Sequence, residues 1–153
     1  MPEDEYKKIL FRFYSDVLEE DTVETMWAII VDEKKGLYRL DNIPIYAPLI
    51  ACDDIIFAEY DEDETMLTYR HTVTPSGNST VQVVIMDDTD IEQVRNELKD
   101  LGCKSEKMNS VYFAMNIPAA VDYGPVKARL EELEQQEIVG YSEPCLSDGH
   151  YPY

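Results

Sequence analysis

The feature that most constrains this chain is a break in its hydrophobic periodicity at residues 74–78. The segment Thr-Pro-Ser-Gly-Asn has the composition of a turn or linker. Before it, short apolar runs alternate with charged turns, which is typical of strands and hairpins. After it, a strand pattern is followed by apolar residues at helical spacing. The break therefore predicts a β-rich unit at 1–75, a second unit at 76–147 and a tail at 148–153.

Five strands are predicted in the first unit. They are expected at 6–14, 25–31, 37–43, 54–60 and 66–73. The charged segment 32–36, whose Gly36 is free to adopt a positive φ, joins two of them in a hairpin, and 61–64 joins two more. The acidic run 19–21 is expected to be a solvated loop. Because this half has no helical pattern, we predict a small antiparallel sheet or barrel.

The second unit is predicted to have the order β-α-β-β-α-β. Its strands are expected at 80–86, 103–108, 110–117 and 138–142. The first helix begins with a capping-box sequence in which the Thr89 hydroxyl accepts from the helix backbone and Glu92 reaches back. Gly102 should end this helix, and Asp122 should cap the second. This is the ferredoxin-like order, so the whole chain is expected to be an α+β protein.

The chain is strongly acidic. Its 32 Asp and Glu against 13 Lys and Arg give a formal net charge of −19, while 44% hydrophobic residues indicate that it can still bury a core. Nucleic acids and anionic membranes are bound through Lys and Arg, so the charge argues against both partners. It favours a basic protein partner. Residues 51–100, with 13 acidic and 3 basic side chains, hold about half of the excess.

Three groups of residues are predicted to bind that partner. One lies on the hairpin around 61–64, one precedes the first helix, and one is the aromatic tail, because Tyr is a frequent anchor at interfaces. The predicted set is Glu59, Asp61, Glu62, Asp63, Glu64, Asp87, Asp88, Asp90, Tyr151 and Tyr153. The alternative interpretation is that the carboxylates serve only solubility.

Patterns that carry metal or catalytic chemistry are missing from the sequence. The run 61–64 has neither the glycine nor the late Glu of a calcium loop, and the two His and three Cys lack zinc spacing. Cys52 with His71 is the one pair considered for nucleophilic catalysis, although a free cysteine is usually a small core residue. The loop 76–80 could present amides to an anion, but a plain turn is expected. We predict no metal, no cofactor and no enzymatic activity.

The cysteines and the N-terminus bear on the compartment. Three widely spaced cysteines are not a disulfide framework, and the acidic N-terminal sequence lacks the features of a signal peptide. No apolar stretch approaches the roughly 20 residues of a membrane span. These observations predict a cytoplasmic protein with reduced thiols.

Four segments resemble, in order, a bacterial family known only as a domain of unknown function. They are Trp27-Ala28, the run 38–47 with Leu-Asp-Asn-Ile-Pro, Cys52-Asp53-Asp54, and Ser-Gly-Asn-Ser-Thr at 76–80. The family pattern has Gly-Asp where this chain has Cys52-Asp53, and commonly His at the position of Asn78. The resemblance covers most of residues 23–147 and implies no established activity.

Small acidic bacterial proteins of this kind resemble immunity proteins, which neutralise toxin domains. We therefore predict an immunity-type inhibitor that docks an acidic face over the active site of a toxin. The alternatives are a structural adaptor, or a small ligand-binding or enzymatic domain that uses a groove between the two units.

Overall fold

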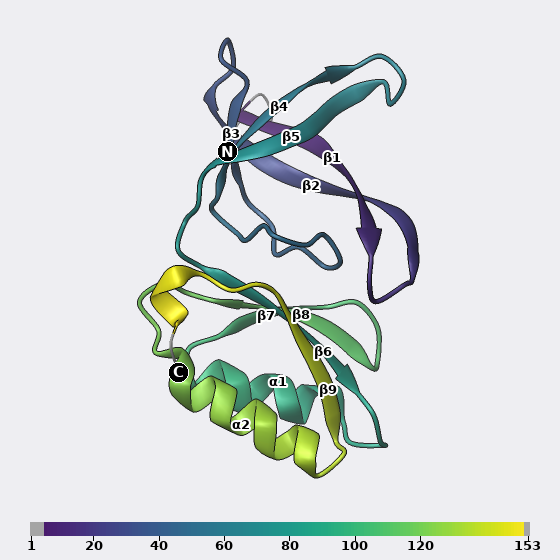
Figure 1. Ribbon diagram of the computed structural model, residues 1–153, viewed down its shortest axis with the longest axis vertical. Coiled ribbons are helices and arrows are strands. Elements are labelled where there is room, and N and C mark those ends of the chain that lie inside the picture. The colour runs from purple at the N-terminus through teal and green to yellow at the C-terminus, as the bar shows by residue number, and fades with distance from the viewer. Residues whose placement is uncertain (1–4, 152–153) are drawn as a thin grey trace. The chain divides into compact units, whose positions relative to one another are not determined.

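The computed structural model describes residues 5–151 of a mixed α/β protein (Figure 1). The chain divides into two compact units, Met1–Ser76 and Gly77–Tyr153. Within the described residues, the first unit has five strands, and the second has four strands and two α-helices.

The first unit is a five-stranded antiparallel sheet that closes into a barrel. Its strands are β1 (Tyr6–Ser15), β2 (Glu20–Asp32), β3 (Leu37–Leu40), β4 (Ile55–Asp61) and β5 (Met66–Thr74). Consecutive strands pair in antiparallel fashion, as the hairpin pattern predicts. The barrel closes where β1 pairs in parallel with β5, at Leu10 and Thr68. Closure leaves the sheet without an open edge.

Two strand ends of the first unit differ from the prediction by more than one residue. β2 begins at Glu20, and its ladder with β1 runs unbroken from Tyr6 opposite Ile29 to Ser15 opposite Glu20. The prediction of a loop over 19–21 therefore holds for Glu19, which lies in the turn, and is wrong for Glu20 and Asp21, because exposed charges are compatible with strand pairing. β3 ends at Leu40 because the side chain of Asn42 then accepts the Trp27 N–H at 2.7 Å, in place of a backbone carbonyl.

Alternating residues of the strands fill the barrel. Ile9 and Phe11 of β1 and Met26 and Ala28 of β2 lie in its core, and the Phe11 ring stacks on Tyr69 at 4.9 Å between centroids. The residues between them point outward, since successive strand side chains face opposite sides.

A 14-residue connection, 41–54, joins β3 to β4 and is held by carboxylates. Both oxygens of Glu24 accept backbone N–H groups, from Ile45 at 2.7 Å, Tyr46 at 3.1 Å and Ala47 at 2.9 Å. The buried Asp54 accepts the N–H of Ala51 at 3.0 Å and of Ser76 at 2.8 Å. These bonds satisfy donors that irregular backbone leaves unpaired.

The second unit has the element order β6-α1-β7-β8-α2-β9. The bounds are β6 (Ser79–Ile85), α1 (Ile91–Asp100), β7 (Lys104–Lys107), β8 (Tyr112–Ile117), α2 (Tyr123–Gln135) and β9 (Val139–Cys145), followed by a 3₁₀ turn (Asp148–His150). The strand order in the sheet is β7-β8-β6-β9. Both helices lie on one face of this sheet (Figure 1), where Val83, Phe113, Leu98 and Leu130 form the core.

The first helix cap differs from the prediction, and the second agrees with it. Asp90, not Thr89, is the N-cap of α1, and its carboxylate accepts the Glu92 N–H at 2.9 Å. Thr89 lies one residue earlier, where its own N–H donates to the Asp87 carboxylate at 2.9 Å. Asp122 caps α2 by accepting the Gly124 N–H at 2.9 Å. Neither helix of the described part is long and apolar enough to span a bilayer.

Candidate functional site

The first predicted acidic group lies at the tip of the β4–β5 hairpin and is partly neutralised. One oxygen of Asp61 accepts the N–H groups of Asp63 and Glu64, at 2.9 and 3.1 Å, and so folds the tip. Arg70 pairs with Asp61 at 2.9 Å and with Glu59 at 3.0 Å. The Arg70 hydrogen bond, followed by the backbone bond from Glu64, lowers the pKa of the Asp61 carboxyl.

A second arginine comes from β1. Arg12 donates to the Glu64 carboxylate at 2.7 Å. Three of the five predicted carboxylates of this group are thus held by guanidinium groups. The other two, Glu62 and Asp63, are exposed and form no ion pair with any residue of the described range. The hairpin tip therefore presents two free carboxylates and three positioned ones.

The second predicted group lies in the connection between β6 and α1 and has local structural roles. Asp87, whose pKa is lowered chiefly by the bond from the Thr89 N–H, closes a turn. Asp90 caps α1, where the positive end of the helix dipole favours a negative charge. Asp88 is exposed and has no ion-pair partner within residues 5–151. Two of these three carboxylates therefore stabilise the local backbone.

The C-terminal segment is tied down as far as His150, which is only 3% exposed. Its Nε2 lies 3.1 Å from the Pro118 carbonyl, which can only accept, so Nε2 carries a hydrogen. Nδ1 is hydrogen-bonded to the Ser79 hydroxyl at 2.5 Å, and that hydroxyl accepts the Ser147 N–H at 2.8 Å. The sequence does not predict these buried hydrogen bonds, because nothing in it pairs a histidine of the C-terminal segment with β6.

The two tyrosines of the predicted set follow His150 in the sequence. Tyr151 is 56% exposed. Tyr153 lies outside the described residues.

The residues considered for catalysis have separate structural neighbours. The Cys52 thiol faces the Leu40 carbonyl at 3.9 Å, while the His71 ring lies against Phe57 at 5.2 Å between centroids. Burial raises the pKa of the Cys103 thiol to about 11, so that thiol is protonated at neutral pH. Within residues 5–151, no three His, Cys, Asp or Glu side chains gather in an arrangement that could hold a metal ion.

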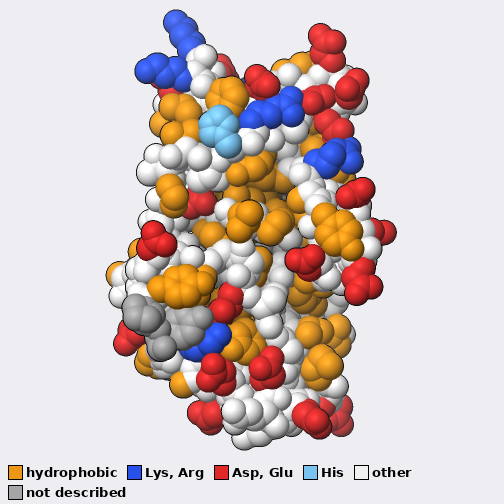
Figure 2. Space-filling model, viewed as in Figure 1, with side chains coloured by type: hydrophobic (Ala, Val, Ile, Leu, Met, Phe, Trp, Pro, Cys, Tyr) orange, Lys and Arg blue, Asp and Glu red, His pale blue; other side chains and the backbone are white. Residues whose placement is uncertain are grey.

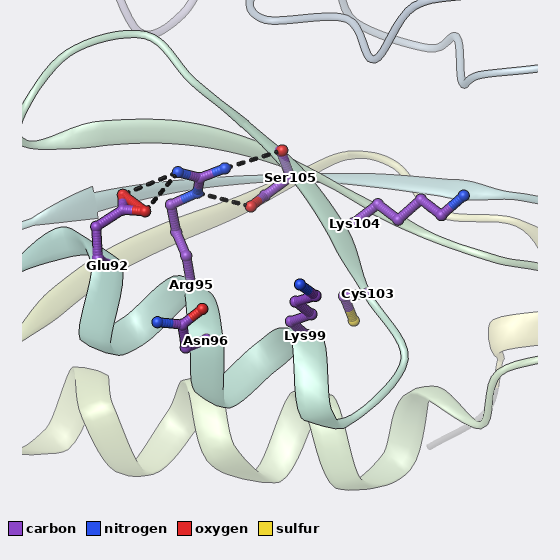
Figure 3. Close-up of a pocket in the computed structure, with 7 residues that line it drawn as sticks. All are labelled: Glu92, Arg95, Asn96, Lys99, Cys103, Lys104 and Ser105. Carbon is purple, nitrogen blue, oxygen red and sulfur yellow. Dashed lines mark hydrogen bonds and ion pairs between the residues drawn. The ribbon is translucent and has the colours of Figure 1, made fainter.

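A surface pocket of about 410 Å³ lies between α1 and β7 (Figure 3). Arg95 crosses it from the helix and donates to Ser105, through Nε to the hydroxyl at 2.8 Å and through Nη2 to the carbonyl at 3.1 Å. Its Nη1 meets both oxygens of Glu92, at 2.9 and 2.8 Å. Lys99 lies one turn further along α1, next to Cys103. The arginine joins α1 to β7, and the sequence reasoning did not single it out.

This chain was compared with solved structures, with curated proteins and with protein-family models. A solved structure described as a hypothetical protein from Neisseria gonorrhoeae is similar, with a TM-score of 0.79 and 26% identity over 92% of this chain and 95% of that chain. A comparison with curated proteins finds no match. A family model described as a domain of unknown function, DUF4265, matches residues 24–141 and includes parts of both units. The chain belongs to the DUF4265 family.

Proposed function

We propose that this protein works by binding another protein, as an immunity-type inhibitor that lays an acidic surface over the basic active site of a toxin domain. The observation that carries the proposal is the number of carboxylates without an internal counterion. Within residues 5–151, eight of the 13 Lys and Arg pair with nine carboxylates, which leaves 21 of 30 Asp and Glu without a cation within 4.0 Å.

Acidic side chains also outnumber basic ones on the face shown in Figure 2. Such an excess costs stability through self-repulsion, and a basic partner would relieve that repulsion. Opposite charges on the two surfaces would also speed the encounter, because they steer diffusion before contact.

The β4–β5 tip supports this function through its geometry. Arg70 and Arg12 hold Glu59, Asp61 and Glu64 in place, so these groups lose less conformational freedom on binding than free side chains would. Glu62 and Asp63 stay exposed for direct contact. The tip thus combines fixed and available carboxylates.

Three finer inferences accompany this function. The element order of the second unit and the sheet order β7-β8-β6-β9 support a ferredoxin-like fold. The scarcity of unpaired cations supports a protein partner over a nucleic acid or an anionic membrane. We also infer a cytoplasmic location, where the three cysteine thiols would stay reduced.

In the test, the purified protein is used to capture its partner from the native cell. The captured protein is then expressed in cells, and co-expression of the present chain should rescue them from its toxicity. Glu62→Lys with Asp63→Lys should slow association with that partner about tenfold, because tip charges act on the encounter. Glu131→Lys with Glu134→Lys is the matched control, since it makes the same change of net charge on exposed residues of α2 without ion pairs. Equal losses from both variants would show that total charge, not the tip, drives binding. A captured partner that is acidic, or not toxic, would contradict the proposal.

A further inference from the structure

The pocket between α1 and β7 has a charge opposite to that of the molecule as a whole. Three cations line it, Arg95, Lys99 and Lys104, against one carboxylate, Glu92. The lining therefore has a formal charge of +2, on a chain of net charge −19. Such a local excess of cations is the opposite of what the composition would place there by chance.

The one carboxylate of the lining is already engaged. Both oxygens of Glu92 accept from Arg95 Nη1, and Lys107 lies 3.8 Å from the same group. Lys99 and Lys104, by contrast, make no ion pair with any residue between 5 and 151, and only three other Lys or Arg share that property. The pocket thus carries two ammonium groups that no carboxylate of the described chain neutralises by contact.

Carboxylates next to the pocket reduce this charge but do not reverse it. The segment 91–107 as a whole has four cations and four carboxylates. One of the four carboxylates, Glu97, is held by Arg129 of α2 at 2.8 Å. Asp100 and Glu106 do not line the pocket. With Arg129 counted, the region stays positive by one charge, while the acidic excess lies elsewhere in the chain.

The helix dipole accounts for only one of these cations. Lys99 lies in the last turn of α1, where the negative end of the dipole favours a cation. Arg95 lies in the middle of the helix, and Lys104 lies on β7. Their presence at the pocket therefore needs another reason.

Arg95 is held in place before any ligand binds. Its Nε and Nη2 donate to the hydroxyl and carbonyl of Ser105, and its Nη1 faces the two oxygens of Glu92. These contacts use four of the five N–H groups of a guanidinium, so one N–H on Nη2 is left to donate. A side chain that is already ordered loses little conformational freedom on binding.

The pocket also offers more hydrogen-bond donors than acceptors. Lys99 rises from the same face of α1 as Arg95, one turn further along, toward β7 (Figure 3). Its ammonium has three N–H groups, and the amide of Asn96 adds two more. Lys104 extends along the rim, away from Arg95 (Figure 3), and contributes its charge from there. Donors with positive charge match a ligand that is anionic and rich in acceptor oxygens.

We propose that this pocket binds the phosphate group of a small phosphate monoester. Such a group carries a charge of about −1.5 to −2 at neutral pH and three strong acceptor oxygens. The pocket volume of about 410 Å³ lies within the range of small-molecule sites, which is about 300–1,000 Å³. A larger polyanion would extend over the acidic surface around the pocket and be repelled there. The proposal goes beyond the immunity-type function and does not rest on it, because the β4–β5 tip belongs to the other unit.

The experiment titrates the full chain with ribose 5-phosphate and follows the backbone amide signals by NMR at constant ionic strength. The signals of Arg95, Lys99, Lys104 and Ser105 should shift with half-saturation at or below about 1 mM, and those of the β4–β5 hairpin should not. Inorganic phosphate should shift the same signals, and ribose alone should not. The absence of saturable shifts, equal shifts with ribose, or tighter binding of a phosphoserine peptide would overturn the proposal.

A pair of matched variants separates the pocket from total charge. Lys99→Gln with Lys104→Gln should weaken the binding of ribose 5-phosphate at least about tenfold, because it removes both unneutralised cations of the lining. Lys34→Gln with Lys35→Gln makes the same change of net charge on two exposed lysines that also make no ion pair within residues 5–151, and it should alter binding by less than about twofold. Equal losses from the two variants would refute the site. Circular dichroism confirms folding, and if a variant unfolds, the wild-type comparison of ribose 5-phosphate with ribose decides the proposal.

Discussion

Replacing Glu24 by Gln should weaken the hydrogen bonding that holds the connection 41–54, while the barrel stays folded. The carboxylate accepts three backbone N–H groups, one at Oε2 and two at Oε1. A glutamine has one accepting oxygen, and its amide nitrogen only donates. Whichever way the amide turns, at least one backbone N–H faces another donor and loses its partner.

The unfolding free energy should fall by about 2 kcal/mol. A hydrogen bond to a charged acceptor contributes about 1.5–3 kcal/mol, and a buried N–H that is left without an acceptor adds the cost of its desolvation. Glu24→Ala removes all three bonds and should cost more. Glu20→Gln is the matched control, since it makes the same chemical change on an exposed residue of the same strand that makes no ion pair among the described residues. The control should stay within about 0.5 kcal/mol of wild type.

Urea unfolding followed by circular dichroism measures the free energy, and amide hydrogen exchange locates the effect. The amides of Ile45, Tyr46 and Ala47 should exchange faster in the Gln variant, while those of the β1–β2 ladder should not. Equal stability of Glu24→Gln and Glu20→Gln, with unchanged exchange at the three amides, would refute the role assigned to Glu24.

Two further predictions concern a helix cap and a thiol. Asp90→Ala should lower the unfolding free energy by about 1 kcal/mol, and Thr89→Ala by less than about 0.5 kcal/mol, when measured by urea unfolding, because Asp90 and not Thr89 caps α1. Equal losses of unfolding free energy in the two variants would contradict the assignment of Asp90 as the cap and favour Thr89. The Cys103 thiol should react with a thiol reagent at pH 8 about a hundredfold more slowly in the folded than in the unfolded protein, since folding raises its pKa from 9.0 to about 11. The folded state then holds this proton more tightly, so stability should fall as pH rises from 9 through 11, and Cys103→Ala should lose less over that window.

The strand pattern of the first unit could be predicted because its signals are local. Alternating apolar residues and charged turns lie within a few positions of one another, and they indicate hairpins directly. Barrel closure has no such signal. It depends on one parallel pairing, Leu10 with Thr68, between strands that are far apart in the sequence. The start of β2 was missed for a different reason, since charged residues are common both in loops and on exposed strand ends.

The ion pairs of the candidate site could be predicted from the sequence only to the same extent, because their formation depends on contacts without a local signal. Arg70 lies at the register shift of the β4–β5 ladder, between the pairs Phe57–His71 and Ala58–Tyr69, so its pairing with Glu59 and Asp61 does not follow from the hairpin pattern. The pairing of Arg12 with Glu64 joins residues 52 positions apart and has no local signal either. The cap of α1 was ambiguous because Thr89 and Asp90 both have side chains able to accept a helix N–H. The turn at Asp87 decides between them, and that turn is visible only in three dimensions.

The carboxylates of this protein divide into two classes with different consequences for mutation. Glu24, Asp54, Asp90 and Asp122 accept backbone N–H groups, so changing them costs stability whether or not a partner is present. Others, such as Glu62, Asp63, Glu131 and Glu134, are exposed and make no ion pair among the described residues. Charge reversal in the second class alone can separate a loss of binding from a loss of folding. A reversal at Asp61 would confuse the two, because it would also break the Arg70 pair and the turn at the tip.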